Sequence, residues 1–284
     1  MSDLKLGDIK KKTSALFENV REQVPLIHQI TNYVTVGDCA NVTLAIGASP
    51  VMADDIAETE DITAISSALL LNMGTLNERT VASMLASGKR ANALGIPVIF
   101  DPVGAGASGF RNKTARKILE QVDVSILRGN LSEISFLAGQ KASTRGVDAS
   151  AADAENDGSA IAQIVARQYH CVTAITGAVD FISDGERTIA IRNGHPMLSK
   201  VTGTGCMTTA LTAAFAAVSE DDLAAAVAGV IAMGIAGEIA FEKVGDRGTG
   251  SFRTTLMDSV SMLTGEFIEA RAKLEVIGDG GRKL

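Results

Sequence analysis

Four short apolar runs, each ending in turn residues, constrain the fold of this 284-residue chain more than any other feature of its sequence. The runs are SALLLNMG (67–74), IPVIFDPVG (96–104), VSILRGN (124–130) and CVTAITG (171–177). Their apolar residues do not alternate with polar ones, which is typical of strands buried on both faces of a parallel sheet. The runs therefore predict a doubly wound sheet, with helices on both sides.

Helical patterns occupy segments between and after these runs. Apolar residues recur at helical spacing over 75–94 and 157–169, and Thr75 followed by Glu78 predicts a capping box at the start of the first helix. The later helical segments are 205–218, 222–243 and 252–272. Alternation of strands and helices predicts an α/β fold with a mostly parallel central sheet.

The sequence shows no sign of a domain boundary. The segment 139–157 is polar, rich in small residues and aperiodic, and we interpret it as a surface loop that can contain a turn of helix. The chain has no internal repeat, and 284 residues are enough for one large α/β domain with a sizeable core. We therefore expect a single domain over 1–284.

Composition argues against several kinds of partner. The net charge of -7 does not suit nucleic-acid binding, which needs a basic face. The N-terminus lacks the apolar core of a signal peptide. The apolar segment Leu223–Gly237 is too short and too rich in small residues to span a membrane, so we expect a buried helix in the core or at a subunit interface. Cys39, Cys171 and Cys206 indicate reduced thiols in a cytoplasmic protein.

Polar residues stand where the predicted strands end. Ligands of open α/β sheets bind at the carboxyl ends of the strands, so Asp101, Arg128 and Thr176 are expected to meet in one cleft. Asp101 is either a turn residue that caps the next helix or a carboxylate for Mg²⁺, directly or through water. Glu133 is either a second partner of Mg²⁺ or the end of a capping box that Asn130 begins. The planar guanidinium of Arg128 suits phosphate oxygens.

Three residues nearer the N-terminus also have more than one interpretation. His28 is either a packed, hydrogen-bonded residue or a catalytic one; it shows no metal-ligand spacing, and we expect the packed role. Asn32 is either a turn residue or a polar residue of a ligand pocket. Met52 is either part of the core or an adaptable wall of a small-molecule pocket.

The stretch VTGTGC (201–206) predicts an anion-binding turn. Backbone N–H groups of Gly203, Thr204 and Gly205 at a helix N-terminus can hold negative charge, although the turn can also be a purely structural helix start. At this terminus the thiol of Cys206 is expected to have a lowered pKa, because the helix dipole favours the thiolate. Cys206 can be a nucleophile, a proton acceptor or a small residue that fits the turn.

The order and spacing of several motifs give a specific resemblance. The motifs are HQITNYVTVGDCAN (28–41), GASPVMADD (47–55), LNMGTL (71–76), DPVGAGAS (101–108), RGNLSEI (128–134), TGAVDFISDG (176–185), VTGTGC (201–206) and GTGSF (248–252). Together they resemble the hydroxyethylthiazole kinase family of the ribokinase-like superfamily over nearly the whole chain. The resemblance implies a ribokinase-like, three-layer α/β/α domain. Cys206 supports it, because sugar and pyridoxine kinases of the superfamily typically have aspartate at that position.

The resemblance also implies an activity and its cofactors. The family phosphorylates the hydroxyl of 4-methyl-5-(2-hydroxyethyl)thiazole with Mg-ATP, in thiamine salvage. Arg128 and Thr176 are implied to contact ATP, with Asp180 nearby in the nucleotide region. Asp101 and Glu133 are implied to support Mg²⁺.

A thiazole pocket at a subunit interface is a further implication. Asn32, Met52 and Gly203 are implied to line it, and Gly203 to Gly205 to form the anion hole. The resemblance implies a homotrimer in which a neighbouring subunit completes each site, so we expect Met52 to act across an interface. Thr249 is a departure, since the family usually has proline at this position of GTGSF, and the change bears on the rigidity of that loop.

Three other functions are weighed beside this one. A related kinase would act on a hydroxymethylpyrimidine or a pyridoxine-like alcohol. A hydrolase with Cys206 as nucleophile would turn over without ATP. A non-catalytic nucleotide-binding scaffold would bind ATP without releasing ADP in response to a substrate.

Overall fold

The computed structural model describes residues 6–139 and 151–277. Its strands are β1 (Leu26–Ile30), β2 (Ser49–Val51), β3 (Ala68–Asn72), β4 (Val98–Asp101), β5 (Ile126–Asn130), β6 (Val172–Thr176), β7 (Asp180–Ser183), β8 (Thr188–Ile191) and β9 (Leu274–Ile277). They form one sheet with the order β2-β1-β3-β4-β5-β6-β7-β8-β9. All pairs from β2 to β6 are parallel, and β7, β8 and β9 are added antiparallel. The predicted α/β class with a mostly parallel sheet is confirmed.

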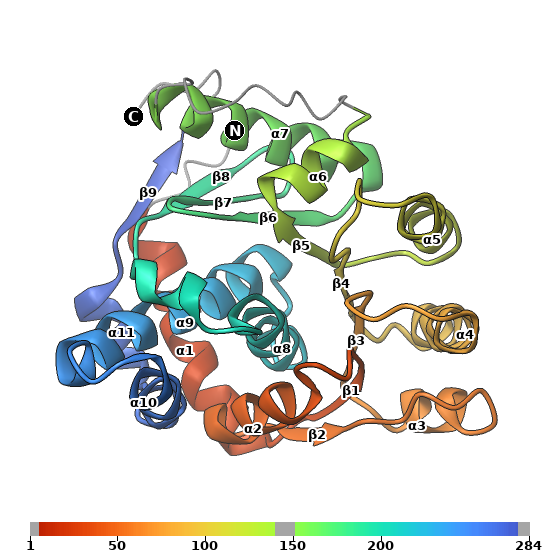
Figure 1. Ribbon diagram of the computed structural model, residues 1–284, viewed down its shortest axis with the longest axis horizontal. Helices are drawn as coiled ribbons and strands as arrows, with labels where there is room; N and C mark the ends of the chain where they lie inside the picture. Colours follow the sequence, from red (N-terminus) through yellow and green to blue (C-terminus); the bar gives the residue numbers. More distant parts are fainter. Residues whose placement is uncertain (1–5, 140–150, 278–284) are drawn as a thin grey trace.

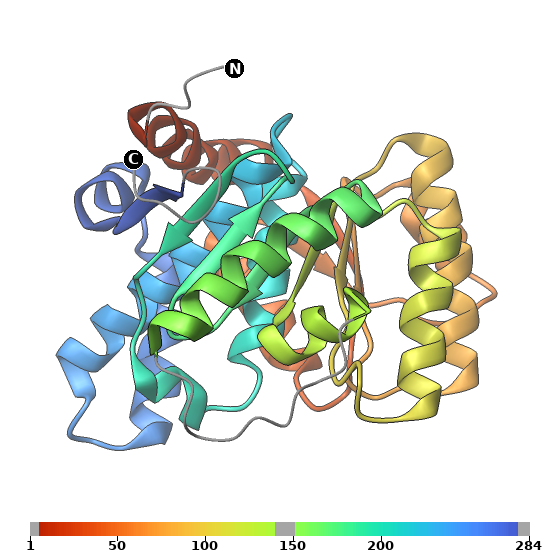
Figure 2. The ribbon, with the colours of Figure 1, turned by 90° about the horizontal axis from the view of Figure 1, so that it is seen from above.

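Helices complete the outer layers. They are α1 (Leu6–Gln23), α2 (Val36–Ile46), α3 (Thr59–Ala64), α4 (Glu78–Leu94), α5 (Gly109–Gln121), α6 (Leu131–Leu137), α7 (Ala151–Tyr169), α8 (Thr204–Ala216), α9 (Asp222–Val244), α10 (Thr249–Ser261) and α11 (Gly265–Arg271), with a 3-10 helix η1 (Pro196–Lys200). Figure 1 shows α4, α5, α6 and α7 on one face of the sheet and α8 and α9 against the other. Figure 2 shows α7 lying across the strands at the antiparallel end.

The four predicted strands are β3 to β6, and they are consecutive in the sheet. β3 and β4 are buried along their whole length. Along β3, Leu70 packs into the core on the α8 side, whereas Leu69 and Leu71 pack into the core on the α4 side. Both faces of these strands therefore need apolar residues, which explains runs without polar alternation.

The predicted cap of the first helix is wrong. α4 begins after Asn77, whose side chain accepts from the Thr80 N–H while the Thr80 side chain accepts from the Asn77 N–H. Thr75 Oγ1 instead accepts a hydrogen bond from the Tyr33 N–H at 3.2 Å. The sequence contains two possible capping pairs, and the tertiary contact of Thr75 selects the later one.

The helix expected over 252–272 is two helices. α10 ends at Ser261, and α11 begins after Thr264, whose hydroxyl accepts from the Phe267 N–H. The turn between them brings Gly265 against α1, so closely that an added Cβ would lie 2.5 Å from the Ser14 carbonyl oxygen. Packing against α1 therefore redirects the chain at this point.

Two other expectations change. Residues 140–150 of the predicted surface loop lie outside the described residues, and 151–157 belong to α7, so the helical part at that end is longer than the single turn expected. α9 has 23 residues and is long and apolar enough to cross a membrane by length and composition. The expectation that this segment is too short to span a membrane is therefore wrong. However, 94% of its most apolar window is buried inside the protein, which makes it a core helix.

Small residues let α8 and α9 approach closely. A Cβ added to Gly229 in α9 would lie 2.1 Å from Thr212 Oγ1 and 2.7 Å from Thr212 Cα in α8. These separations leave no room for a methyl group at this crossing. The position of α8 on the sheet therefore depends on glycine at residue 229.

We expect Gly229→Ala to lower the free energy of unfolding by about 1–3 kcal/mol, because the added methyl overpacks the contact with Thr212. Urea-induced unfolding followed by circular dichroism measures this change. Gly250→Ala is the matched control, since a Cβ at Gly250 in α10 meets no atom within 4 Å. Unchanged stability of Gly229→Ala would contradict the close helix crossing.

Candidate active site

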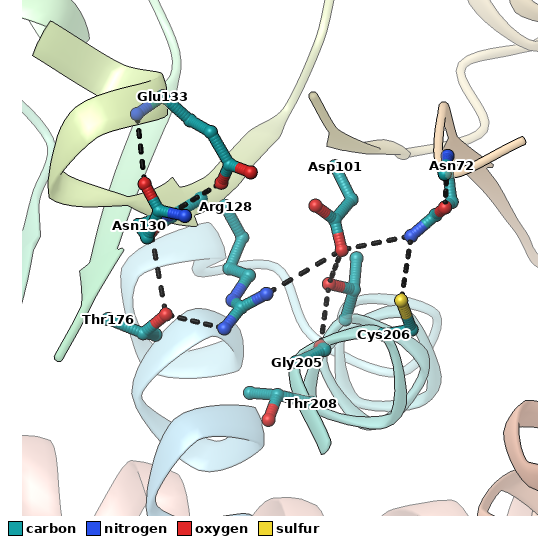
Figure 3. Close-up of polar contacts among 12 residues, drawn as sticks. Asn72, Asp101, Arg128, Asn130, Glu133, Thr176, Gly205, Cys206 and Thr208 are labelled. Carbon is teal, nitrogen blue, oxygen red and sulfur yellow. Dashed lines mark hydrogen bonds and ion pairs between the residues drawn. The ribbon is translucent and has the colours of Figure 1, made fainter. Parts of the chain in front are cut away.

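Four neighbouring strands bring their carboxyl ends to one edge of the sheet. β3, β4, β5 and β6 are consecutive and parallel, and their register pairs Asn72 with Asp101 and Asn130 with Thr176. The expected meeting of Asp101, Arg128 and Thr176 is therefore confirmed. Figure 3 shows these side chains gathered beside the first turn of α8.

Asp101 is only 1% exposed, and the carboxylate is held by three elements. Its Oδ2 accepts from Asn72 Nδ2 at 3.0 Å and from Thr209 Oγ1 at 2.7 Å, and lies 3.6 Å from Arg128 Nη1. Burial raises the pKa of Asp101 to about 6, against the opposing effect of Arg128. Asp101 does not cap the next helix, because Ser108 does. Its buried Oδ1 has no partner among the described residues.

Glu133 forms the predicted capping box. Its Oε2 accepts from the Asn130 N–H at 2.8 Å, and the Asn130 side chain accepts from the Glu133 N–H at 2.9 Å. Its Oε1 accepts from the Gly104 N–H at 2.8 Å, in the loop after β4. The Glu133 charge also adds to the rise in the Asp101 pKa that burial causes. The carboxylate therefore joins the ends of β4 and β5 close to Asp101.

Arg128 spans the space between the strand ends and α8. Its Nη2 donates to Thr176 Oγ1, and its Nη1 faces Asp101. Gly205 permits this position, because a Cβ at that residue would lie 2.7 Å from Arg128 Nη1. The buried Nε of Arg128 has no partner among the described residues. Such a guanidinium can still bind an anionic ligand.

The turn before α8 requires glycine at residue 203. Gly203 is the N-cap residue with a φ of 85°, in the left-handed region, and a Cβ on it would lie 2.5 Å from Thr35 Cγ2. Thr204 Oγ1 donates to the Leu198 carbonyl oxygen at 3.1 Å, which ties the turn to η1. Both the positive φ and the close approach of Thr35 therefore exclude residues other than glycine at this position.

The first turn of α8 begins with backbone donors that lack a partner within the helix. The N–H of Met207 bonds the Gly203 carbonyl oxygen at 2.8 Å. The N–H groups of Thr204, Gly205 and Cys206 precede that bond, so they have no partner in the helix. Three adjacent donors at a helix N-terminus can hold an anion.

Cys206 is a hydrogen-bonded thiol. Its Sγ accepts from Asn32 Nδ2 and from Asn72 Nδ2, each at 3.3 Å. Burial raises the pKa of the Cys206 thiol, the charge of Asp101 adds to the rise, and the two amides oppose it. The predicted lowering of the pKa at this helix terminus is wrong, because lost hydration and a nearby carboxylate outweigh the local donors. A neutral thiol does not suit a nucleophile.

A pocket of about 510 Å³ opens beside this turn. Thr204 and Gly205 line it from α8, and Arg128 and Thr176 line it from the strand ends. Asp180 lines it from β7 and is 8% exposed, with Oδ1 accepting from the Gly177 N–H at 2.9 Å. Burial raises the pKa of Asp180 to about 7. The predicted residues of the nucleotide region therefore share one cavity.

Asn32 lies on the other side of α8, with Cys206. Its Oδ1 accepts from the Thr35 N–H at 3.1 Å, and its Nδ2 also donates to Asn72 Oδ1 at 3.0 Å. Met52 packs against the core and lines a second pocket of about 300 Å³. Neither Asn32 nor Met52 therefore lines the 510 Å³ pocket.

His28 is packed and hydrogen-bonded, as expected. Its Nδ1 is 2.9 Å from Thr63 Oγ1, and its Nε2 is 2.7 Å from the Ala53 carbonyl oxygen. Burial lowers its pKa. Both of its ring nitrogens therefore have partners inside the protein.

Sequence reasoning missed three residues of the site. Asn72 ends the run LLLN, so its place at a strand end was an available signal. Thr209 reaches Asp101 from α8, and nothing in its local pattern marks it. His195 lines the larger pocket and stacks on Phe241, with ring centroids 3.6 Å apart, and its sequence context carries no signal.

The fold is similar to that of a ribokinase-like protein. It superposes on a ribokinase-like superfamily protein from Enterococcus faecalis V583 with a TM-score of 0.60 and 10% sequence identity, over 91% of this chain and 95% of the other. At this identity the likeness shows the fold alone. The expected three-layer α/β/α architecture is thereby confirmed.

Sequence similarity is more specific than the fold. The hydroxyethylthiazole kinase family matches residues 17–266. A hydroxyethylthiazole kinase from Ruminiclostridium cellulolyticum is 57% identical over 273 residues, which cover 96% of this chain and 100% of the relative. The solved structure of a hydroxyethylthiazole kinase protein from Pyrococcus horikoshii OT3 has 39% identity and a TM-score of 0.86, over 94% of this chain and 99% of the other. The chain belongs to the hydroxyethylthiazole kinase family.

The buried Asp180 makes stability depend on pH. Its pKa is about 7 in the folded protein and 3.8 ordinarily, so folding favours the protonated form. The contribution of this carboxyl group to stability is fully present below its ordinary pKa, and it is lost as the pH rises through its pKa in the folded protein. Asp180→Asn keeps an acceptor for the Gly177 N–H and removes the titration. We expect the free energy of unfolding of this variant, relative to that of the parent, to increase by about 1–4 kcal/mol as the pH rises from 4 to 8.

Urea unfolding at several pH values measures the difference between the Asp180→Asn variant and the parent. Asp246→Asn, at an exposed position, is the charge-matched control. A difference between Asp180→Asn and the parent that does not change with pH would show that burial does not control this carboxyl group.

Proposed function

We propose that this chain is an ATP-dependent kinase that phosphorylates the hydroxyl of 4-methyl-5-(2-hydroxyethyl)thiazole in thiamine metabolism. Family membership supports the reaction and the substrate. The structural observation that carries the proposal is the position of the first turn of α8. It lines the 510 Å³ pocket through Thr204 and Gly205 and contacts Asn32 through Cys206. One anion-binding turn thus stands between the two reactants.

The larger pocket suits ATP. Its volume is within the usual range for a ligand of this size. Arg128 and Thr176 would contact the phosphate-bearing part, with Asp180 in the nucleotide region. The N–H groups that follow Gly203 would hold the transferred phosphoryl group, whose charge spreads over its oxygens during transfer.

The residues at the strand ends fit Mg²⁺. Asp101 Oδ1 is a buried acceptor with no partner in the described parts of the chain, which suits the ion or a water bound to it. Glu133 already accepts two backbone hydrogen bonds, so we propose that it supports the ion through water. No group of three acidic, His or Cys side chains in the described residues could hold a metal. This agrees with an ion that takes most ligands from water and phosphate, where it neutralises charge.

Cys206 is proposed to receive the hydroxyl proton or to orient the hydroxyl. The raised pKa keeps this thiol neutral, and a neutral thiol cannot take a further proton, so only its thiolate form could receive the hydroxyl proton. In its neutral form Cys206 would orient the hydroxyl, whose proton would leave late, after bonding to phosphorus has begun. Phosphoryl transfer tolerates this, because its transition state is loose and depends mainly on positioning. The raised pKa also argues against the alternative of a hydrolase with a Cys206 thiolate nucleophile.

The thiazole would lie between Asn32 and the 300 Å³ pocket that Met52 lines. Two residues that line this pocket, Tyr33 and Val36, are 78% and 36% exposed. Such apolar exposure suggests an interface. We propose a homotrimer in which a neighbouring subunit covers these side chains and completes the thiazole site.

Location and domain structure complete the proposal. We propose a cytoplasmic enzyme, which the three free cysteines support. We also propose that the chain is a single domain over 1–284. The continuous sheet, whose strands run from Leu26 to Ile277, supports this.

A coupled assay for ADP formation tests the function. We expect ADP release with Mg-ATP to depend on the thiazole alcohol and to exceed that with a hydroxymethylpyrimidine or pyridoxine. Preference for either of these alcohols would favour a related kinase. Product formation without ATP would favour a hydrolase, and ATP binding without ADP release would favour a scaffold.

Asp101→Asn tests the metal assignment. The amide keeps the shape of the side chain but is a weaker ligand for a hard cation. We expect half-maximal activity to need about tenfold more Mg²⁺, equal to about 1.4 kcal/mol. Identical magnesium titrations of the variant and the parent would remove Asp101 from the metal site.

Substitutions of Cys206 test whether this residue accepts the proton of the substrate hydroxyl. A carboxylate at this position would accept hydrogen bonds from the same two amides and is ionised near neutral pH, so it can take the proton, whereas a neutral thiol must first lose its own. We therefore expect Cys206→Asp to keep or raise kcat and Cys206→Ser to lower it by about tenfold. Unchanged kcat in both variants would rule out proton transfer at this residue.

A further inference from the structure

Asn72 lies between two groups of the proposed reaction centre (Figure 3). It ends β3 and is 2% exposed. Its Nδ2 donates to Asp101 Oδ2 at 3.0 Å and to Cys206 Sγ at 3.3 Å. One amide nitrogen therefore uses both of its hydrogens, one on the carboxylate and one on the thiol.

The orientation of the Asn72 amide is fixed by the backbone. Its Oδ1 accepts from the Gly74 N–H at 2.9 Å. A backbone N–H can only donate, so the amide oxygen must face Gly74, and the nitrogen must face Asp101 and Cys206. The turn after β3 thus determines which end of the amide reaches the site.

Asn32 is fixed in the same way. Its Oδ1 accepts from the Thr35 N–H, which directs Nδ2 toward Asn72 Oδ1 and Cys206 Sγ. The four hydrogens of the two amides are then all assigned, and two of them point at one sulfur atom. The Cys206 sulfur is held as an acceptor, which leaves its S–H hydrogen free to point away from both amides.

We propose that Asn72 is a positioning residue for phosphoryl transfer, which holds the Cys206 sulfur and the Asp101 carboxylate in fixed relation through the two hydrogens of one amide. This inference rests on the proposed function. Asn72 need not touch a reactant, because it acts through the two groups that would. Positioning of this kind affects the rate of transfer more than the binding of ATP, since Asn72 does not line the nucleotide pocket.

Asn72→Asp tests this role with little change of shape. Aspartate keeps an oxygen for the Gly74 N–H but loses both donors and adds charge beside Cys206. We expect kcat to fall by about tenfold or more while the KM for ATP changes by less than about twofold. In a Cys206→Ala background the same substitution should cost at least about threefold less, because the two residues act together.

The reactivity of Cys206 provides a second measurement that needs no kinase reaction. Mass spectrometry can follow iodoacetamide labelling at Cys206, since Cys39 and Cys171 are buried. We expect labelling of Asn72→Asp at pH 8.5 to be at least about fivefold slower, because loss of the donor and the added charge disfavour the thiolate. If the new charge prevents folding, Asn72→Ala removes the same donors without it and should also slow labelling and lower kcat.

Asn92→Asp is the matched control. Asn92 Oδ1 accepts from the Asp123 N–H, and its Nδ2 donates to the Asp123 carbonyl oxygen, each at 2.8 Å, at the opposite end of the strands. This variant should leave kcat and labelling unchanged. Unchanged labelling and kcat in Asn72→Asp, or an equal loss of kcat with and without Cys206, would overturn the inference. Slower labelling in a protein that does not phosphorylate the thiazole alcohol would reject the proposed function instead.

Discussion

Burial of the Asp101 carboxylate is the constraint on which the rest of the site depends. A buried carboxylate is costly unless donors surround it, and these donors come from three different elements. Asn72 of β3, Arg128 of β5 and Thr209 of α8 all face the same oxygen, Oδ2. The strand ends and α8 are therefore fixed relative to one another by one charge. Since Oδ2 receives all of these contacts, Oδ1 has no partner among the residues that the structure describes.

The position of α8 explains the division of the site. Its first turn presents backbone N–H groups and Gly205 to the larger pocket, and it presents Cys206 to the two asparagines. Glycine at residue 205 lets the Arg128 guanidinium lie against this turn. The arrangement supplies charge and geometry, while the neutral thiol offers little covalent reactivity. Such a site is suited to direct phosphoryl transfer between two held reactants.

The sequence could predict the parts of this site that depend on local pattern. Asp101, Arg128 and Thr176 follow apolar runs, and parallel strands bring such positions to one edge. The contact of Thr209 could not be predicted, because it depends on how α8 is rotated on the sheet. The thiol pKa of Cys206 was mispredicted for a similar reason. A helix terminus is visible in sequence, whereas burial and the charge of Asp101 arise only from the tertiary fold.

The stereochemical course at phosphorus tests the central claim most directly, namely that the hydroxyl attacks ATP without a covalent enzyme intermediate. ATP made chiral at the γ-phosphorus with oxygen isotopes would be reacted with the thiazole alcohol, and the configuration of the product phosphate determined. A single in-line transfer predicts inversion. Retention would contradict the account, because it requires two transfers and a phosphorylated residue, for which Cys206 would be the first candidate.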